Sequence, residues 1–82
     1  MQYTYIPKGV CSRQIVIDAA DGIINDIRFI GGCSGNTQGI GALVKGMAID
    51  DVITRLEHIR CGNRPTSCPD QLAQALKLVK QQ

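Results

Sequence analysis

Four cysteines are the side chains of this sequence best suited to chemistry, and each lies beside residues that break helices and strands. They are Cys11, Cys33, Cys61 and Cys68. A cysteine that only fills a core usually behaves as a small buried hydrophobe. Here the neighbouring glycine, serine and proline residues leave room, and backbone N–H groups, for a ligand to approach each thiol. If the fold brings the four segments together, they form a pocket lined by thiolates.

The spacing of these cysteines leaves more than one chemistry open. They are separated by 22, 28 and 7 residues, which is not the paired Cys-x-x-Cys or Cys/His arrangement of zinc fingers and zinc ribbons. One interpretation is a metal or cluster site that uses at least three of the four. The other is a set of unliganded thiols, with or without one disulfide.

Length and composition indicate one small domain. The chain has 82 residues, of which 44% are hydrophobic, and we expect a single domain over residues 1–82. A core of this size often needs a metal, a disulfide or an oligomeric partner, so the sequence is compatible with a homodimer. The net charge is +2 and the basic residues are scattered, so no nucleic-acid partner is expected.

No feature of the sequence indicates a membrane or a secretory route. No apolar run approaches the ~18–20 residues that span a bilayer, and the first residues do not resemble a signal peptide. We therefore expect a cytoplasmic protein with no membrane partner. In the cytoplasm, persistent disulfides are uncommon, and clustered cysteines more often bind metal or carry out redox chemistry.

The first third of the chain has the alternating pattern of β-strands. Strands are predicted over 2–7, 13–18 and 23–30, and Asp21-Gly22 predicts a tight hairpin between the last two. These elements form a three-stranded antiparallel meander. In the third strand, strict alternation places Ile23, Ile27 and Phe29 on one face and the remaining isoleucines on the other.

The rest of the chain predicts three helices. Asn36 is expected to cap a helix that runs to Val44 and is ended by Gly46; two internal glycines weaken it unless close packing requires them. A second apolar stripe has helical spacing and predicts a helix that ends at Cys61-Gly62. It consists of Ile49, Val52, Ile53, Leu56 and Ile59. His58 is then a surface residue of that helix.

The third helix has the clearest start signal. Ser67 is predicted as the N-cap and Cys68 as the first helical residue, with Pro69 allowed there and Asp70 in the place of a capping-box acid. Free N–H groups and the helix dipole at this end stabilise a thiolate. Cys33 has a similar place before the first helix. The fold class is therefore α+β, with a three-stranded meander followed by three helices packed on one face of the sheet.

The segment Thr66-Ser67-Cys68-Pro69-Asp70, with Gly31-Gly32-Cys33 upstream, resembles the TSCPD domain family. That family occurs at the C-terminus of cobalamin-dependent (class II) ribonucleotide reductases and as free-standing small proteins with four cysteines. The resemblance implies a role beside ribonucleotide reduction and DNA synthesis. Because 82 residues cannot hold cobalamin, nucleotide and radical machinery, we expect no ribonucleoside-diphosphate reductase activity from this chain alone.

A second resemblance is architectural. It rests on the run 21–29 followed by Gly32-Cys33, on the run 43–47 and on the late Cys68. In these residues the chain is similar to the U-type iron–sulfur cluster scaffold proteins. That resemblance implies a meander followed by helices, with cysteines from a strand loop, a strand-to-helix turn and a final helix start at one site. By position these are Cys11, Cys33 and Cys68.

The chain departs from the scaffold pattern at two places. The scaffold proteins have Cys-Gly-Asp where this chain has Cys11-Ser12-Arg13, and this chain adds Cys61. A lost acid and a gained thiol suggest tighter metal retention than a transfer scaffold needs.

Three functions follow as hypotheses. The first is a zinc- or iron–sulfur-cluster-binding module with Cys11, Cys33, Cys61 and Cys68 as ligands, supported by Gly32, Ser67, Pro69 and Asp70. Its partner would be a ribonucleotide reductase or an iron–sulfur protein. The second is an accessory thiol relay or docking module for ribonucleotide reduction, with Cys68 and Cys61 as the redox pair. The third is an interaction protein whose cysteines are incidental.

Overall fold

A computed structural model describes residues 2–10, 12–31 and 34–81 of the chain. Cys11, Gly32 and Cys33 lie outside the described residues. The elements, in chain order, are three strands and three helices, as the sequence predicts. They are β1 (Gln2–Tyr5), β2 (Ser12–Ala20), β3 (Ile23–Gly31), α1 (Ser34–Val44), α2 (Ile49–Leu56) and α3 (Cys68–Lys80).

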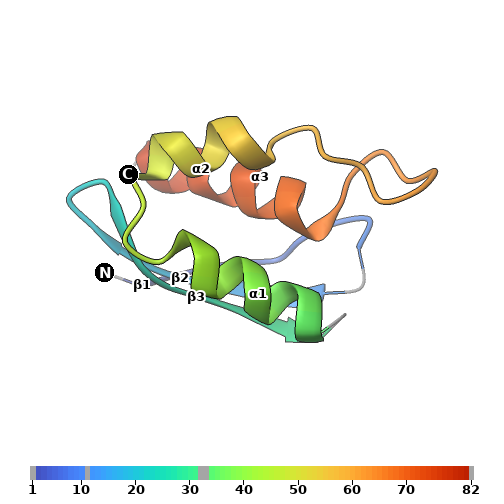
Figure 1. Cartoon of the computed structure of the whole chain (residues 1–82), viewed down its shortest axis with the longest axis horizontal. Coiled ribbons are helices and arrows are strands. Elements are labelled where there is room, and N and C mark those ends of the chain that lie inside the picture. Colours follow the sequence, from blue (N-terminus) through green and yellow to red (C-terminus); the bar gives the residue numbers. More distant parts are fainter. Residues whose placement is uncertain (1, 11, 32–33, 82) are drawn as a thin grey trace.

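The strands form an antiparallel meander in the order β1-β2-β3 (Figure 1). Asp21 and Gly22 join β2 to β3, and both have left-handed backbone angles, with φ of 56° and 77°. Two successive positive φ values are typical of a type I′ turn, whose twist matches that of the strands it connects. The predicted hairpin is therefore confirmed.

A β-bulge in β3 overturns the predicted assignment of its two faces. Asp18 pairs with Asp26, but the next residue, Ala19, pairs with Ile24, so Asn25 is an extra residue in β3. The extra residue breaks the strict alternation on which the prediction depended. As a result Ile24 is fully buried and Ile23 is 39% exposed.

A second irregularity in β2 turns a polar side chain toward the interior. Ser12 pairs with Gly31 and Gln14 with Ile30, so Arg13 is the extra residue here. The bulge places Ser12 and Ile15 on the same buried face of β2. Bulges of this kind re-aim a single side chain at the edge of a sheet.

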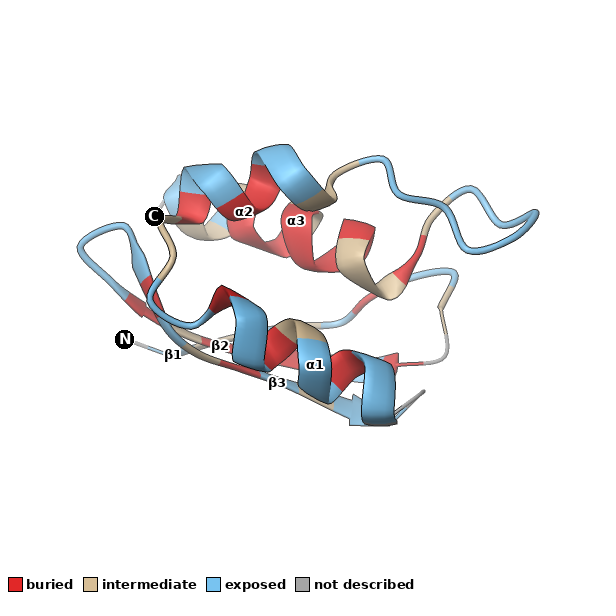
Figure 2. Cartoon of the chain, in the orientation of Figure 1, coloured by how far each residue is buried: buried red, intermediate tan, exposed pale blue. Residues whose placement is uncertain are grey.

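All three helices lie on one face of the sheet, as predicted (Figure 1). α1 packs against β3, and α2 packs against α3. The buried residues gather between the sheet and the helices (Figure 2). The core consists of Ile15, Ile17, Ala19, Ile24, Ile27, Val44, Ile49, Val52, Ile53, Leu72, Ala75 and Leu76. Within the described residues, no helix has the length and apolar character needed to cross a bilayer.

Helix α1 begins earlier than predicted and depends on one of its glycines. It starts at Ser34, so Asn36 lies inside the helix and is not its cap. A Cβ on Gly41 would come 2.8 Å from the carbonyl oxygen of Ile27, whereas a Cβ on Gly39 would meet nothing within 4 Å. Gly41 therefore permits the close approach of α1 to β3, and Gly39 does not serve that purpose.

Helix α2 ends at Leu56 and not at Cys61-Gly62, so that prediction is wrong. Glu57 makes the last helical bond, to Ile53, and has extended backbone angles. His58 follows with a φ of 69°; it is exposed but lies outside the helix. Its N–H donates to the carboxylate of Asp70 at 2.7 Å. A tertiary hydrogen bond has replaced the helical one, and Ile59 is 41% exposed beyond the helix.

Replacing the two α1 glycines should give stability changes of opposite sign. Gly39→Ala should stabilise the protein by about 0.5–1 kcal/mol, because alanine loses less backbone entropy in a helix. Gly41→Ala should destabilise it, because its methyl group would collide with the backbone of Ile27. Urea unfolding of both variants measures the difference. Equal stability of the two would contradict the close packing of α1 on β3.

Candidate functional site

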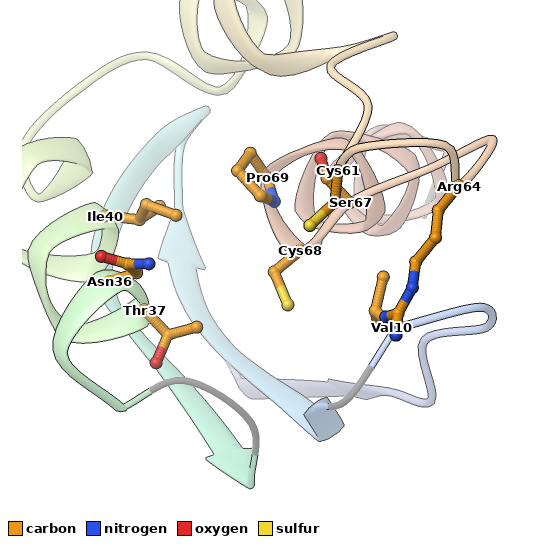
Figure 3. A pocket seen from close by; sticks show the side chains of 9 residues that line it. All are labelled: Val10, Asn36, Thr37, Ile40, Cys61, Arg64, Ser67, Cys68 and Pro69. Carbon is orange, nitrogen blue, oxygen red and sulfur yellow. The ribbon is translucent and has the colours of Figure 1, made fainter.

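A cavity of about 390 Å³ lies between α1, the start of α3 and the loop that precedes α3. Its described lining comes from three parts of the chain that are distant in sequence (Figure 3). The lining residues are Val10, Asn36, Thr37, Ile40, Cys61, Arg64, Ser67, Cys68 and Pro69. The side chain of Cys68 points into the space between α1 and Val10 (Figure 3). The cavity is thus the place where long-range folding has brought cysteines and polar groups together.

Two of the four predicted ligands line this cavity, and the other two lie outside the described residues. Cys61 is exposed, Cys68 is half-buried, and both are free thiols. Val10 lines the cavity directly before Cys11 in the chain, and Asn36 lines it three residues after Cys33. Within the described residues, no group of three or more His, Cys, Asp or Glu side chains is positioned to hold a metal.

Cys68 occupies the position that the sequence predicts. Ser67 is the N-cap of α3, and its hydroxyl accepts a hydrogen bond from the N–H of Asp70 at 3.2 Å. Pro69 lies in the first turn, where its missing N–H has no helical partner to lose. The buried hydroxyl of Ser12 forms a hydrogen bond with the sulfur of Cys68, with an Oγ–Sγ distance of 2.9 Å.

The buried carboxylate of Asp70 holds both ends of the loop that carries Cys61. One oxygen accepts hydrogen bonds from the backbone N–H of His58 at 2.7 Å and from the side chain of Gln74 at 3.1 Å. The other accepts from the hydroxyl of Thr66 at 2.5 Å. His58 and Thr66 are near the two ends of the segment 57–67, which we call the Cys61 loop.

Two further contacts close the Cys61 loop. The hydroxyl of Ser67 donates to the carbonyl oxygen of Ile59 at 2.7 Å. Within the loop, the N–H of Cys61 donates to the carbonyl oxygen of Thr66 at 3.2 Å. Because Ser67 also caps α3, the same short stretch of chain starts the helix and fastens the loop.

The family model of the TSCPD domain matches residues 1–80. This chain belongs to the TSCPD domain family. No curated protein and no solved structure matched it. Membership of this family is consistent with a small domain of the kind linked to ribonucleotide reductases. The likeness to the U-type scaffold proteins stays a prediction.

The structure explains each residue of the motif that names the TSCPD domain. Thr66 and Asp70 hydrogen-bond to each other, Ser67 caps α3, Cys68 faces the cavity, and Pro69 fits the first helical turn. Asp70 occupies the place of a capping-box acid, but its carboxylate bonds to the Cys61 loop. The motif therefore joins the Cys61 loop to the start of α3 and exposes the thiol of Cys68 to the cavity.

The described lining of the cavity carries positive charge. Among the described lining residues, Arg64 is the one with a formal charge. The N-terminal ends of α1 and α3 both contribute residues to the lining, and a helix N-terminus carries a partial positive charge. These groups offset the charge that several thiolates would bring together.

Sequence reasoning missed two polar residues beside the site, Ser12 and Gln71. Only the bulge at Arg13 aims Ser12 at Cys68, and no local pattern reveals that bulge. Gln71 did leave a signal, because it precedes Ala75 by one helical turn on the buried stripe of α3. A polar residue on an apolar stripe indicates an internal hydrogen-bonding role.

Asp70 also makes stability depend on pH. Burial alone would raise the pKa of Asp70, but hydrogen bonds from Thr66, the His58 backbone and Gln74 outweigh it and lower that pKa below its ordinary value of 3.8. A lowered folded-state pKa means that the ionised carboxylate stabilises the fold above about pH 4, and that this contribution is lost as the pH falls through the folded pKa.

Asp70→Asn should lower the free energy of unfolding at pH 7 by about 1–3 kcal/mol, because an amide cannot accept all the donors that the carboxylate accepts. The variant should also lose part of the acid-induced fall in stability. Urea unfolding from pH 7 to pH 3 measures both effects. The exposed Asp51→Asn is the matched control and should stay within about 0.5 kcal/mol of wild type. If the free energy of unfolding of Asp70→Asn fell between pH 7 and pH 3 as steeply as that of wild type, Asp70 would not be a source of the pH dependence.

Proposed function

We propose that this TSCPD domain is a metal- or iron–sulfur-cluster-binding module whose ligands are Cys11, Cys33, Cys61 and Cys68. One observation supports the proposal most directly. Cys61 and Cys68 line the same cavity, together with residues close in sequence to the other two cysteines. Residues 10 and 36 are close enough in sequence to Cys11 and Cys33 for those thiols to reach the same space.

The donor set suits thiophilic metals. Zn²⁺ takes four thiolates in a tetrahedral site, and [2Fe–2S] and [4Fe–4S] clusters are also held by four cysteines. A site whose four positions are all filled by protein thiolates leaves none for substrate, so a zinc ion there would be structural. Ser12, as a hydrogen-bond partner of Cys68, would then help to orient a ligand.

Cavity size gives room for more than a single ion. Its volume of about 390 Å³ is comparable to pockets that bind small molecules. The volume does not decide between a mononuclear ion and a cluster, and the metal content of the isolated protein distinguishes them.

A second candidate function is a thiol relay for ribonucleotide reduction, which follows from the family membership. Cys61 and Cys68 are both free and line the same cavity. In this role the pair would pass two electrons and two protons to a disulfide of the reductase, which becomes two thiols as a Cys61–Cys68 disulfide forms. A docking module without redox chemistry is the simpler form of the same association.

Protein purified without oxygen and without an affinity tag should contain metal bound by thiolates. Elemental analysis with an absorption spectrum checks this. About one zinc per chain without visible absorbance indicates a closed structural site, whereas iron and sulfide with a brown colour indicate a cluster. Folded protein with no metal and four titratable thiols would contradict the proposal and leave the relay or docking role.

Cys61→Ser separates the two candidate functions. If the site binds metal, the variant should lose more than about 100-fold in Co²⁺ affinity, because losing a ligand should cost more than losing an outer-shell partner. Metal-loaded protein should also melt at a lower temperature. If the pair is a relay, the variant should keep its stability and lose only disulfide formation, measured by thiol titration after mild oxidation.

A further inference from the structure

Gln71 is a buried amide whose two polar atoms bond to different loops. It lies in the first turn of α3 and is 8% exposed. Its Oε1 accepts hydrogen bonds from the backbone N–H of Lys8 at 3.0 Å and from the hydroxyl of Tyr5 at 3.3 Å. Its Nε2 donates to the hydroxyl of Thr66 at 3.0 Å. One side chain thus joins the end of β1, the segment after it and the end of the Cys61 loop.

The direction of these hydrogen bonds follows from donor chemistry. The N–H of Lys8 can only donate, so the amide atom facing it must be oxygen, and Nε2 must face Thr66. Since Thr66 accepts from Gln71, its own proton is directed to Asp70. The bonds therefore form a directed chain from Lys8 through Gln71 and Thr66 to Asp70.

A close contact beside Gln71 shows how tightly the two loops meet. Gly9 has a φ of 75°, and a Cβ built on it would lie 3.1 Å from a methyl carbon of Thr66. We call residues 6–10 the Cys11 approach, because they lead directly to Cys11 in the chain. The Cys11 approach and the Cys61 loop are therefore packed against each other at Thr66, and Gln71 bonds to both.

We propose that Gln71 is a positioning residue for the metal site, which sets the Cys11 approach relative to the Cys61 loop and the thiol of Cys68. The inference rests on the metal-binding function proposed above. Three of the proposed ligands are near Gln71 or its partners in the chain: Cys68 precedes Gln71 by three residues, Cys11 follows Lys8 by three, and Cys61 belongs to the same loop as Thr66.

Glutamine is suited to this position because the site needs an acceptor and a donor on one side chain. The backbone N–H of Lys8 requires an acceptor. Thr66 already gives its own proton to Asp70, so the hydroxyl of Thr66 requires a donor. Methionine has a similar length without either group, so Gln71→Met tests the hydrogen bonds while it keeps most of the packing. Gln38→Met is the matched control. It makes the same chemical change at an exposed position of α1 that is not among the described lining residues of the cavity.

The experiment is a Co²⁺ titration combined with alkylation of each cysteine by N-ethylmaleimide in the cobalt-loaded protein. Trypsin releases Cys11 in residues 9–13 and Cys33 in residues 29–45, so mass spectrometry measures the two thiols separately. Gln71→Met should weaken Co²⁺ binding by about 10- to 100-fold, as loss of outer-shell partners does. Cys11 should be alkylated about tenfold faster or more, with Cys33 still protected. Gln38→Met should behave like wild type.

The outcomes separate the inference from the function on which it rests. If wild-type protein binds no Co²⁺, the proposed function fails and the inference with it. If wild type binds but Gln71→Met matches Gln38→Met, only the inference is overturned. Uniform exposure of all the thiols in Gln71→Met also overturns it, because a loss of overall stability would explain that result.

Two further measurements keep the test valid if Gln71→Met does not fold. Gln71→Glu retains acceptor atoms for Lys8 and Tyr5 and loses only the donor to Thr66, so it should keep Cys11 protected in the cobalt-loaded protein. In wild type, the Lys8 amide should exchange with solvent about tenfold more slowly, or slower still, than the amide of Asn63 in the exposed loop, because it donates to a buried acceptor. Equal exchange rates would overturn the inference.

Discussion

The buried carboxylate of Asp70 is the interaction on which the candidate site depends. A buried carboxylate is costly unless donors satisfy it, and three donors from different places in the chain do so here. The backbone N–H of His58 is one of these donors. Because it bonds to Asp70 and not to the helix, α2 ends at Leu56. Supplying another fastens Thr66 at the far end of the Cys61 loop. The Asp70 carboxylate, the Cys61 loop and the start of α3 therefore form one unit around the thiol of Cys68.

Two β-bulges decide which side chains the sheet turns toward the helices. The bulge at Asn25 places Ile24 and Ile27 together on the buried face, where the core needs them. The bulge at Arg13 turns Ser12 inward to the sulfur of Cys68. Each bulge adds a single residue and each alters a whole face of its strand, because side chains in a strand alternate with a period of two. The sheet thus contributes both the platform and one polar contact.

The described lining of the cavity carries positive charge. Arg64 contributes a guanidinium group to it, and α1 and α3 each contribute residues near their N-terminal ends. Positive groups and helix N-termini attract anionic ligands. A set of bound thiolates would bring negative charge to the same place, and these groups would offset it. The charge of the lining is therefore compatible with the proposed thiolate site.

Local signals determined much of this protein from sequence alone. Asp21-Gly22 dictates the hairpin, Ser67 starts α3, and the Thr66–Asp70 motif identifies the family. These features depend on interactions between residues near each other in the chain, so a sequence pattern contains them. The end of α2, the faces of β3 and the contacts of Ser12 and Gln71 were decided only by tertiary structure. The contacts of Ser12 and Gln71 depend on partners far away in the sequence, such as Lys8 for Gln71 at a separation of 63 residues, and no local pattern can encode which distant donor a buried acceptor will meet.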